Sequence, residues 1–278
     1  MEETFFKSIY NRDPLETKEI LRNNPTINVN WKNMLVLGRT ALHIAARLDL
    51  DQTVAILLAH PGIDVNVKDE EDETPFMCAC YLGRTSCARL LLKDSRVNVN
   101  QPSQDGSGPL YWAARHGNVQ VIKYWIASGR EMDLGEPGNE NTDAIAVAKK
   151  PLIWVWETDS GFEERIIRCA QVATLLEKFM ENPMEKRYEM RVELGCRHEL
   201  AAEVYALVVF VSDGLLGILE TGANPARFFA IASQLPLELQ IVLCCRVVGS
   251  STDFISGEQA EVSFRELGKS LQGRPIHN

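Results

Sequence analysis

The sequence of 278 residues has little that would place it in a membrane, on a nucleic acid or in an oxidising compartment. Its longest apolar run, residues 204–211, is well short of the roughly 20 residues that a membrane-spanning helix needs. The formal net charge is −9 and no block of basic residues occurs, which disfavours nucleic acids and anionic membranes as partners. The seven cysteines show no regular spacing, and the amino terminus shows no signal-peptide pattern. We therefore expect a cytoplasmic protein with reduced thiols and leave the nucleus open as a location.

Patterns typical of catalysis and metal binding are also missing from the sequence. Gly106 and Gly108 precede a proline without a neighbouring lysine, unlike a phosphate-binding loop. The histidines and cysteines do not occur in the paired spacings that supply four zinc ligands. Three of the cysteines, Cys78, Cys80 and Cys87, fall within predicted helices, where cysteine behaves as a small apolar residue. We expect a protein that is not an enzyme and binds no metal and no cofactor.

What the sequence does contain is a repeat of 34 residues. Thr40, Thr74, Gly108 and Thr142 each head a similar segment, and Thr4 heads an earlier one. After each head come an apolar position, a small or aliphatic position and then an apolar pair, a pattern that predicts two short amphipathic helices joined by a turn. Such a unit cannot bury its apolar face alone, so the units are expected to stack.

Several of these segments resemble the ankyrin repeat. They are Thr-Ala-Leu-His at 40–43, Ala-Ala-Arg at 45–47, Asp-Val-Asn at 64–66 and His-Gly-Asn-Val-Gln-Val-Ile at 116–122. The resemblance runs from residue 3 to about residue 180. It implies an all-α solenoid of about five helix–turn–helix units with short hairpin connections. The apolar patterns beyond the repeats predict a helical C-terminal extension. We expect the stack to occupy residues 1–182, with its last unit interrupted by an insert at 149–163.

The resemblance implies a non-enzymatic scaffold that binds a protein partner through the concave face of the stack, as a monomer. In the ankyrin family, partners are contacted by the tips of the connections and by the residues that follow the Ala-Ala pair. Carried over position by position, these contacts fall on Val36, Leu37, Arg39, Arg47, Leu48, Glu70, Glu71, Glu73, Tyr81, Leu82, Gln104, Asp105, Ser107, Arg115 and His116.

Three further features have two interpretations each. The connection at 34–37 is apolar where tips are normally polar, so it either folds back on Trp31 or contacts a partner. The acidic run at 69–73 is either a solvated turn or a ligand for a basic partner. Trp154 and Trp156 of the insert either pack internally or anchor a partner.

Residues 183–278 lie outside the repeat and are rich in apolar helical patterns. They either cap the stack or form a small domain docked on it. The stretch 235–271, with Leu-Pro-Leu-Glu-Leu at 235–239 and Phe-Arg-Glu-Leu at 264–267, is similar to an F-box. That similarity implies an alternative function, a ubiquitin-ligase substrate receptor whose C-terminal helices bind an adaptor. Helices are predicted near 183–211, 214–220, 225–234, 236–248 and 257–271.

Overall fold

A computed structural model describes residues 1–151, 159–196, 201, 204–209, 232 and 237–247. Within these ranges the regular structure is helical, and the only β-pairing is an isolated bridge between Asn33 and Arg39. The chain divides into two compact units, Met1–Arg187 and Tyr188–Asn278. The repeats lie in the first unit.

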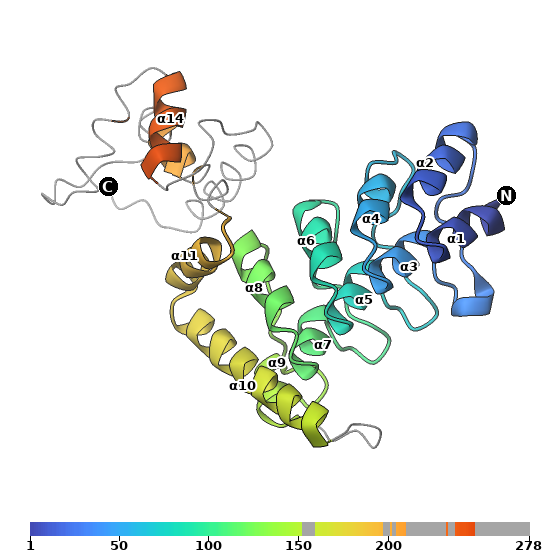
Figure 1. Ribbon diagram of the computed structural model, residues 1–278. Coiled ribbons are helices and arrows are strands. Elements are labelled where there is room, and N and C mark those ends of the chain that lie inside the picture. The colour runs from blue at the N-terminus through green and yellow to red at the C-terminus, as the bar shows by residue number, and fades with distance from the viewer. Residues whose placement is uncertain (152–158, 197–200, 202–203, 210–231, 233–236, 248–278) are drawn as a thin grey trace, which may run out of the picture. The chain divides into compact units, whose positions relative to one another are not determined.

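The repeats form pairs of antiparallel helices arranged in two rows. The first helices of successive pairs lie side by side, and the second helices form a row behind them (Figure 1). This arrangement confirms the all-α repeat fold that the sequence predicts. The pairs are α1 (Glu2–Tyr10) with α2 (Pro14–Asn23), α3 (Ala41–Arg47) with α4 (Asp51–Leu58), α5 (Pro75–Tyr81) with α6 (Thr85–Lys93), α7 (Pro109–Arg115) with α8 (Val119–Ser128), and α9 (Ala144–Lys149) with α10 (Asp159–Glu181).

The residues that head the repeats begin the first helices. Thr74 is the N-cap of α5 and its hydroxyl accepts a hydrogen bond from the backbone N–H of Met77 at 3.2 Å. Thr40 caps α3 in the same position, and its backbone N–H donates to Nδ1 of His43 at 3.2 Å. Nε2 of this buried ring lies 3.0 Å from the carbonyl oxygen of Glu73 in the next unit. His43 therefore joins a helix start to the neighbouring connection, as a neutral ring with the proton on Nε2.

The turns between paired helices need a left-handed backbone. Gly83 and Gly117 both have φ of +66°, a conformation that glycine adopts without steric strain. At Gly117 a Cβ atom would also come within 2.8 Å of Cβ of Arg168 on α10. The second unit has Asp49 at this position, with φ of +58°, and aspartate is one of the few other residues that tolerate the conformation. The departure from glycine that the sequence shows here therefore leaves the turn unchanged.

Small residues let the first helices pack closely. Ala45, Ala79 and Ala113 stand five positions after their heads and are fully buried. The second helices contribute larger side chains, of which Leu57 and Leu91 are fully buried. Cysteines extend the same core, as the sequence predicts: Cys78, Cys80 and Cys87 are buried free thiols on α5 and α6.

Asparagine side chains tie each extended connection to the next unit. Asn66 ends the second connection; its Nδ2 donates to the carbonyl of Arg96 at 2.8 Å, and its Oδ1 accepts from the backbone N–H of Asn98 at 2.7 Å. Asn30 and Asn100 make the corresponding pair of bonds in the units before and after. One side chain thus satisfies a donor and an acceptor of its neighbour.

The second helix of the last pair, α10, packs against α8 and α9 and also touches α7. Its residue Cys169 is fully buried, with Sγ 3.7 Å from the carbonyl oxygen of Ala114. The ends of the predicted insert at 149–163 are helical, because Lys149 ends α9 and Asp159 begins α10. Trp154 and Trp156 lie outside the described residues.

The C-terminal segment departs from one predicted element. The predicted helix at 183–211 is interrupted: α11 (Pro183–Glu193) ends before Gly195, which takes a left-handed φ of +69°, and residues 201 and 204–209 are again helical. A second predicted helix is present as α14 (Leu237–Val247). None of the helices in the described part of the chain is long and apolar enough to cross a membrane. The helices predicted at 214–220, 225–234 and 257–271, and most of the F-box-like stretch, lie wholly or almost wholly outside the described residues.

Truncating a buried leucine of the second helices should weaken the stack. Leu91 is fully buried between α6 and its neighbours, so Leu91→Ala should lower the free energy of unfolding by about 2–5 kcal/mol. Leu15, exposed on α2, offers a matched control, and Leu15→Ala should change that free energy by less than about 0.5 kcal/mol. Urea unfolding followed by circular dichroism measures both. Equal effects at the two positions would contradict the assigned core.

Acid should destabilise the repeats through His43. Burial lowers the pKa of His43 from 6.5 to about 4, so between these pH values the unfolded chain binds a proton that the folded chain does not. Stability should therefore be greatest above pH 6.5 and fall as the pH drops through this window, by on the order of 3 kcal/mol from this ring. Urea unfolding at several pH values tests this, with His43→Gln as the comparison. The variant should lose less stability on acidification than the parent, and equal slopes would refute the assignment.

Candidate protein-binding face

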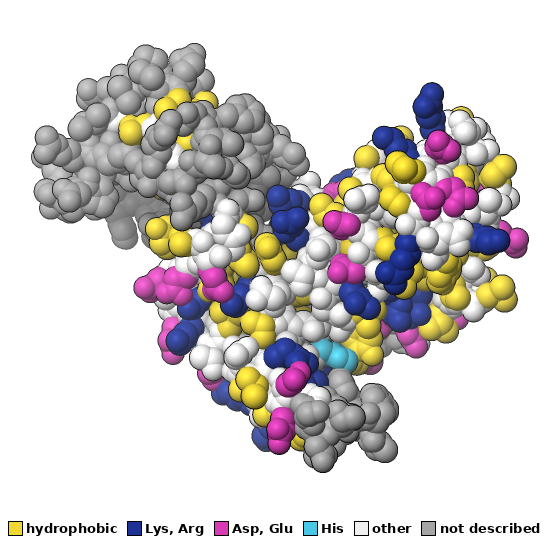
Figure 2. All heavy atoms as spheres, in the orientation of Figure 1, with side chains coloured by type: hydrophobic (Ala, Val, Ile, Leu, Met, Phe, Trp, Pro, Cys, Tyr) yellow, Lys and Arg dark blue, Asp and Glu magenta, His cyan; other side chains and the backbone are white. Residues whose placement is uncertain are grey.

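The residues that the sequence nominates as contacts fall on one set of elements. They lie at the tips of the extended connections and at the C-terminal ends of α3, α5 and α7. We call this surface, from the second to the fourth unit, the inner face. In the view of Figure 2 basic and acidic side chains are interspersed over the described residues, without a large area of one sign. Any preference of the inner face for a partner must therefore come from local groups of side chains, because the surface charge as a whole favours neither sign.

An aromatic cluster stands at the centre of the inner face. Tyr81 at the end of α5 meets Trp112 of α7 edge to face, with ring centroids 5.5 Å apart. The same tyrosine meets the His116 ring at 4.4 Å and 81°. All three side chains are half-buried. Aromatic pairs in this geometry are favourable, so α5 and α7 hold the cluster in place across a unit boundary.

Arg115 completes the aromatic cluster. Its guanidinium carbon lies 5.3 Å from the Trp112 ring centroid and 6.0 Å from that of Tyr111. One Nη1 hydrogen bond of 3.0 Å to the Tyr111 hydroxyl fixes the group, and that hydroxyl donates in turn to the carbonyl of Glu140 at 2.9 Å. The arginine is therefore a positioned cation stacked on aromatic rings rather than a mobile surface charge.

Trp112 belongs to this cluster although the family contact pattern does not nominate it. Positions 112, 115 and 116 are three and four residues apart on the end of α7 and so share one side of it. That spacing is visible in the sequence, but the partner ring, Tyr81, comes from the unit before. The indole Nε1–H of Trp112 and the Nε–H of Arg115 are both buried and have no acceptor within the described residues.

Arg39, also nominated as a contact, is engaged inside the protein. Its Nε lies 3.0 Å from Oδ2 of Asp69, and its Nη2 lies 3.4 Å from Glu73 and 3.7 Å from Glu71. The arginine side chain is 12% exposed and that of Asp69 is fully buried. The first connection is thus fastened to the second by an ion pair with little access to solvent.

These three carboxylates form the one described group that could hold a cation. Their oxygens lie within 4.8 Å of one another. The guanidinium of Arg39 already contacts all three, so a metal ion would have to displace it. Burial, reinforced by the charge of Asp69, raises the pKa of Glu73 above its usual range. The arrangement is an internal ion-pair network.

The acidic run at 69–73 is an ordered turn with two exposed side chains. Oδ1 of Asp69 accepts hydrogen bonds of 2.9 Å from the backbone of both Glu71 and Glu73. Backbone bonds join this turn to its neighbours, from Glu70 N–H to the Leu37 carbonyl at 3.0 Å and from Gln104 N–H to the Glu71 carbonyl at 3.1 Å. Glu70 and Glu71 therefore project from a fixed backbone.

The remaining nominated residues differ in their access to solvent. Gln104, Asp105 and Leu37 are exposed, and Val36, Arg47, Leu48 and Leu82 are half-buried. Ser107 is buried and its hydroxyl donates to the carbonyl of Asn141 at 2.8 Å, so it joins two connections and offers nothing to a partner.

Known proteins resemble this chain through the repeats. The family model for ankyrin repeats in three copies matches residues 62–136, and the single ankyrin repeat model matches residues 37–70. The SMC5-SMC6 complex localization factor protein 1 of Homo sapiens is 33% identical over 175 residues, which are 62% of this chain and 16% of the relative. Its counterpart in Bos taurus is 27% identical over 167 residues, 60% of this chain and 15% of the relative. Rabankyrin-5 of Homo sapiens is 28% identical over 90 residues, 32% of this chain and 8% of the relative.

The chain thus spans less than a fifth of each of these relatives. Among solved structures, the ankyrin repeat protein EF0377 matches 62% of this chain and 82% of its own, with 22% identity and a TM-score of 0.48. The helix pairs from α3 to α8, the turns at Gly83 and Gly117 and the connections ending at Asn66 and Asn100 lie where the two family models match. Residues 37–136 are ankyrin repeats, and this chain is an ankyrin repeat protein.

Proposed function

We propose that this chain is a non-enzymatic protein-binding scaffold whose inner face holds a segment of a protein partner. The observation that carries the proposal is the aromatic cluster of Tyr81, Trp112, Arg115 and His116. Tyrosine, tryptophan and arginine are the residue types that dominate binding energy at protein interfaces. Here they are half-buried and fixed by one another, so little conformational entropy is lost when a partner covers them.

The chemistry of the cluster suits a partner that presents oxygen acceptors. The half-buried Arg115 keeps guanidinium N–H donors besides the Nη1 hydrogen that bonds to Tyr111. A carboxylate or a main-chain carbonyl of a partner placed against this guanidinium would accept from it, and charge-assisted bonds of this kind are strong. The exposed Glu70 and Glu71, one unit away, would face a basic part of the same partner. The partner segment would thus carry both an acceptor group and a positive charge.

The relatives support the module and leave the partner open. Proteins with unrelated names, among them a localization factor of the SMC5-SMC6 complex and rabankyrin-5, match 62% and 32% of this chain. Their names point to no common partner. We therefore infer the kind of partner from Tyr81, Trp112 and Arg115 of this chain.

We also propose the organisation in which this scaffold works. Residues 1–182 would form the binding stack and residues 183–278 would either cap it or form a small separate domain, a division supported by the two compact units that meet at residue 187. An intracellular location is supported by the seven free thiols.

Parallel affinity capture with the parent and with variants of the cluster tests the scaffold role. Full-length parent, Tyr81→Ala and Arg115→Ala are immobilised and the retained proteins are quantified. Arg89 and Tyr124 provide a matched arginine–tyrosine control, because they pair with 5.8 Å between guanidinium and ring on the second helices α6 and α8. The parent, Arg89→Ala and Tyr124→Ala should retain equal amounts of the true partner. Either cluster variant should retain about tenfold less of it, or even less than that.

Folding of each variant is measured by urea unfolding, because Tyr81→Ala removes two ring contacts worth about 0.5–1.5 kcal/mol each. Arg115→Lys separates charge from shape: it keeps the cation but loses the planar group stacked on Trp112, and should bind nearly as weakly as Arg115→Ala. If every protein retained by the parent is retained equally by folded Tyr81→Ala and Arg115→Ala, the inner face is not the binding surface.

The acidic tip should affect the rate of association more than the lifetime of the complex. Glu70→Gln combined with Glu71→Gln should slow association of the captured partner several-fold at low salt, because long-range attraction to its basic part is lost. The difference should shrink at high salt. Glu16→Gln combined with Glu19→Gln on α2 removes the same charge outside the inner face and should change the rate little. Stopped-flow or surface-binding kinetics measure this, and a salt-independent loss through faster dissociation would argue against a steering role.

A further inference from the structure

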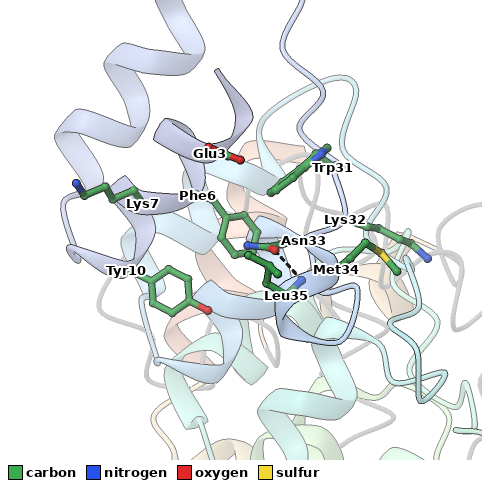
Figure 3. A pocket seen from close by; sticks show the side chains of 9 residues that line it. All are labelled: Glu3, Phe6, Lys7, Tyr10, Trp31, Lys32, Asn33, Met34 and Leu35. Carbon is green, nitrogen blue, oxygen red and sulfur yellow. Dashed lines mark hydrogen bonds between the residues drawn. The ribbon is translucent and has the colours of Figure 1, made fainter.

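A groove in the first unit lies apart from the aromatic cluster. Its volume is about 450 Å³, within the range of ligand-binding pockets. α1 provides one side and the connection 31–35 provides the other (Figure 3). At its floor Phe6 and Trp31 meet edge to face at 5.7 Å, so the floor is aromatic and preformed.

The rim of the groove exposes apolar side chains on a fixed backbone. Leu35 is 94% exposed and Met34 is 66% exposed. Their turn is held by the Asn33 side chain, which accepts from the backbone N–H of Leu35 at 3.0 Å, and by the bridge from Asn33 to Arg39. Met34 and Leu35 of this tip are therefore not buried against Trp31, whereas Val36 is half-buried. Exposed apolar side chains on a backbone that is already fixed favour partner binding, because little conformational entropy is lost when the partner covers them.

Charged side chains around the groove favour an acidic occupant. Lys7 of α1 and Lys32 of the connection stand on opposite sides of the apolar floor (Figure 3). The Lys32 ammonium is positioned by a hydrogen bond of 2.7 Å to the carbonyl of Lys68. With Glu3 as the only lining carboxylate, two lysines against one glutamate give the groove a local charge of +1, in a chain of net charge −9.

We propose that this groove binds an acidic peptide segment of a partner protein. The segment inserts one bulky apolar side chain between Phe6, Trp31 and Leu35, and places acidic side chains near Lys7 on one side and Lys32 on the other. This adds a second contact surface to the scaffold and is independent of the aromatic cluster of the inner face.

A displayed library of random peptides of about 12 residues, panned against the full chain, tests the groove. Selected peptides should share a bulky apolar residue next to an acidic one. Their Kd, measured by fluorescence anisotropy, should rise about tenfold or more with Leu35→Ser or Met34→Ser, and several-fold with Lys7→Glu, the latter effect shrinking at high salt. Leu15→Ser and Lys18→Glu on the exposed side of α2 are matched controls and should change nothing.

Failure of the groove is distinguishable from failure of the inner face, because Tyr81→Ala and Arg115→Ala should bind the selected peptides as the parent does. All substituted groove residues are exposed, so thermal unfolding should show each variant folded. The proposal is overturned if no peptide is selected, if the selected peptides are basic or lack the apolar anchor, or if Leu35→Ser binds them unchanged. A concentration-dependent dimer that Leu35→Ser abolishes would assign the groove to a second copy of the chain instead.

Discussion

The hydrogen bonds of three asparagine amides determine how the units of this stack are spaced. Asn30, Asn66 and Asn100 each reach forward and bind one carbonyl and one N–H of the next connection. A side chain that must satisfy both partners tolerates little change in the distance or the rotation between units. The spacing of the connections, and hence of the tips on the inner face, depends on this constraint together with the packing of the first helices.

The fold could be predicted from the sequence because its determinants are local. Thr74 caps the helix that follows it, Gly83 sits in the turn that needs it, and Ala79 lies where two helices approach closely. The cap and the turn depend on neighbours a few residues away, the alanine packs against the first helices of the adjacent units, and the pattern recurs after 34 residues. Recurrence also makes an exception such as Asp49 recognisable, because the same backbone conformation is required of a different residue.

The candidate site could be predicted only in outline, because its contacts cross unit boundaries. Family positions indicate Tyr81 and Arg115, but the tryptophan that joins them is recognisable only once α5 and α7 are packed side by side. Arg39 shows the opposite error: a residue nominated as a contact is neutralised by carboxylates 30 to 34 positions further along the chain. Which charges remain available to a partner is decided by this packing.

Burial of the thiols in the third unit has a consequence for how opening of the stack can be observed. Burial raises the pKa of Cys78 to about 12 and raises the pKa of Cys80 and Cys87 as well, so in the closed stack almost no reactive thiolate exists at neutral pH. An alkylating reagent can then modify these side chains only during transient separation of α5 and α6 from their neighbours. The chain thus carries natural reporters at the middle of the repeats, and the alkylation of these cysteines records how often the centre of the stack opens.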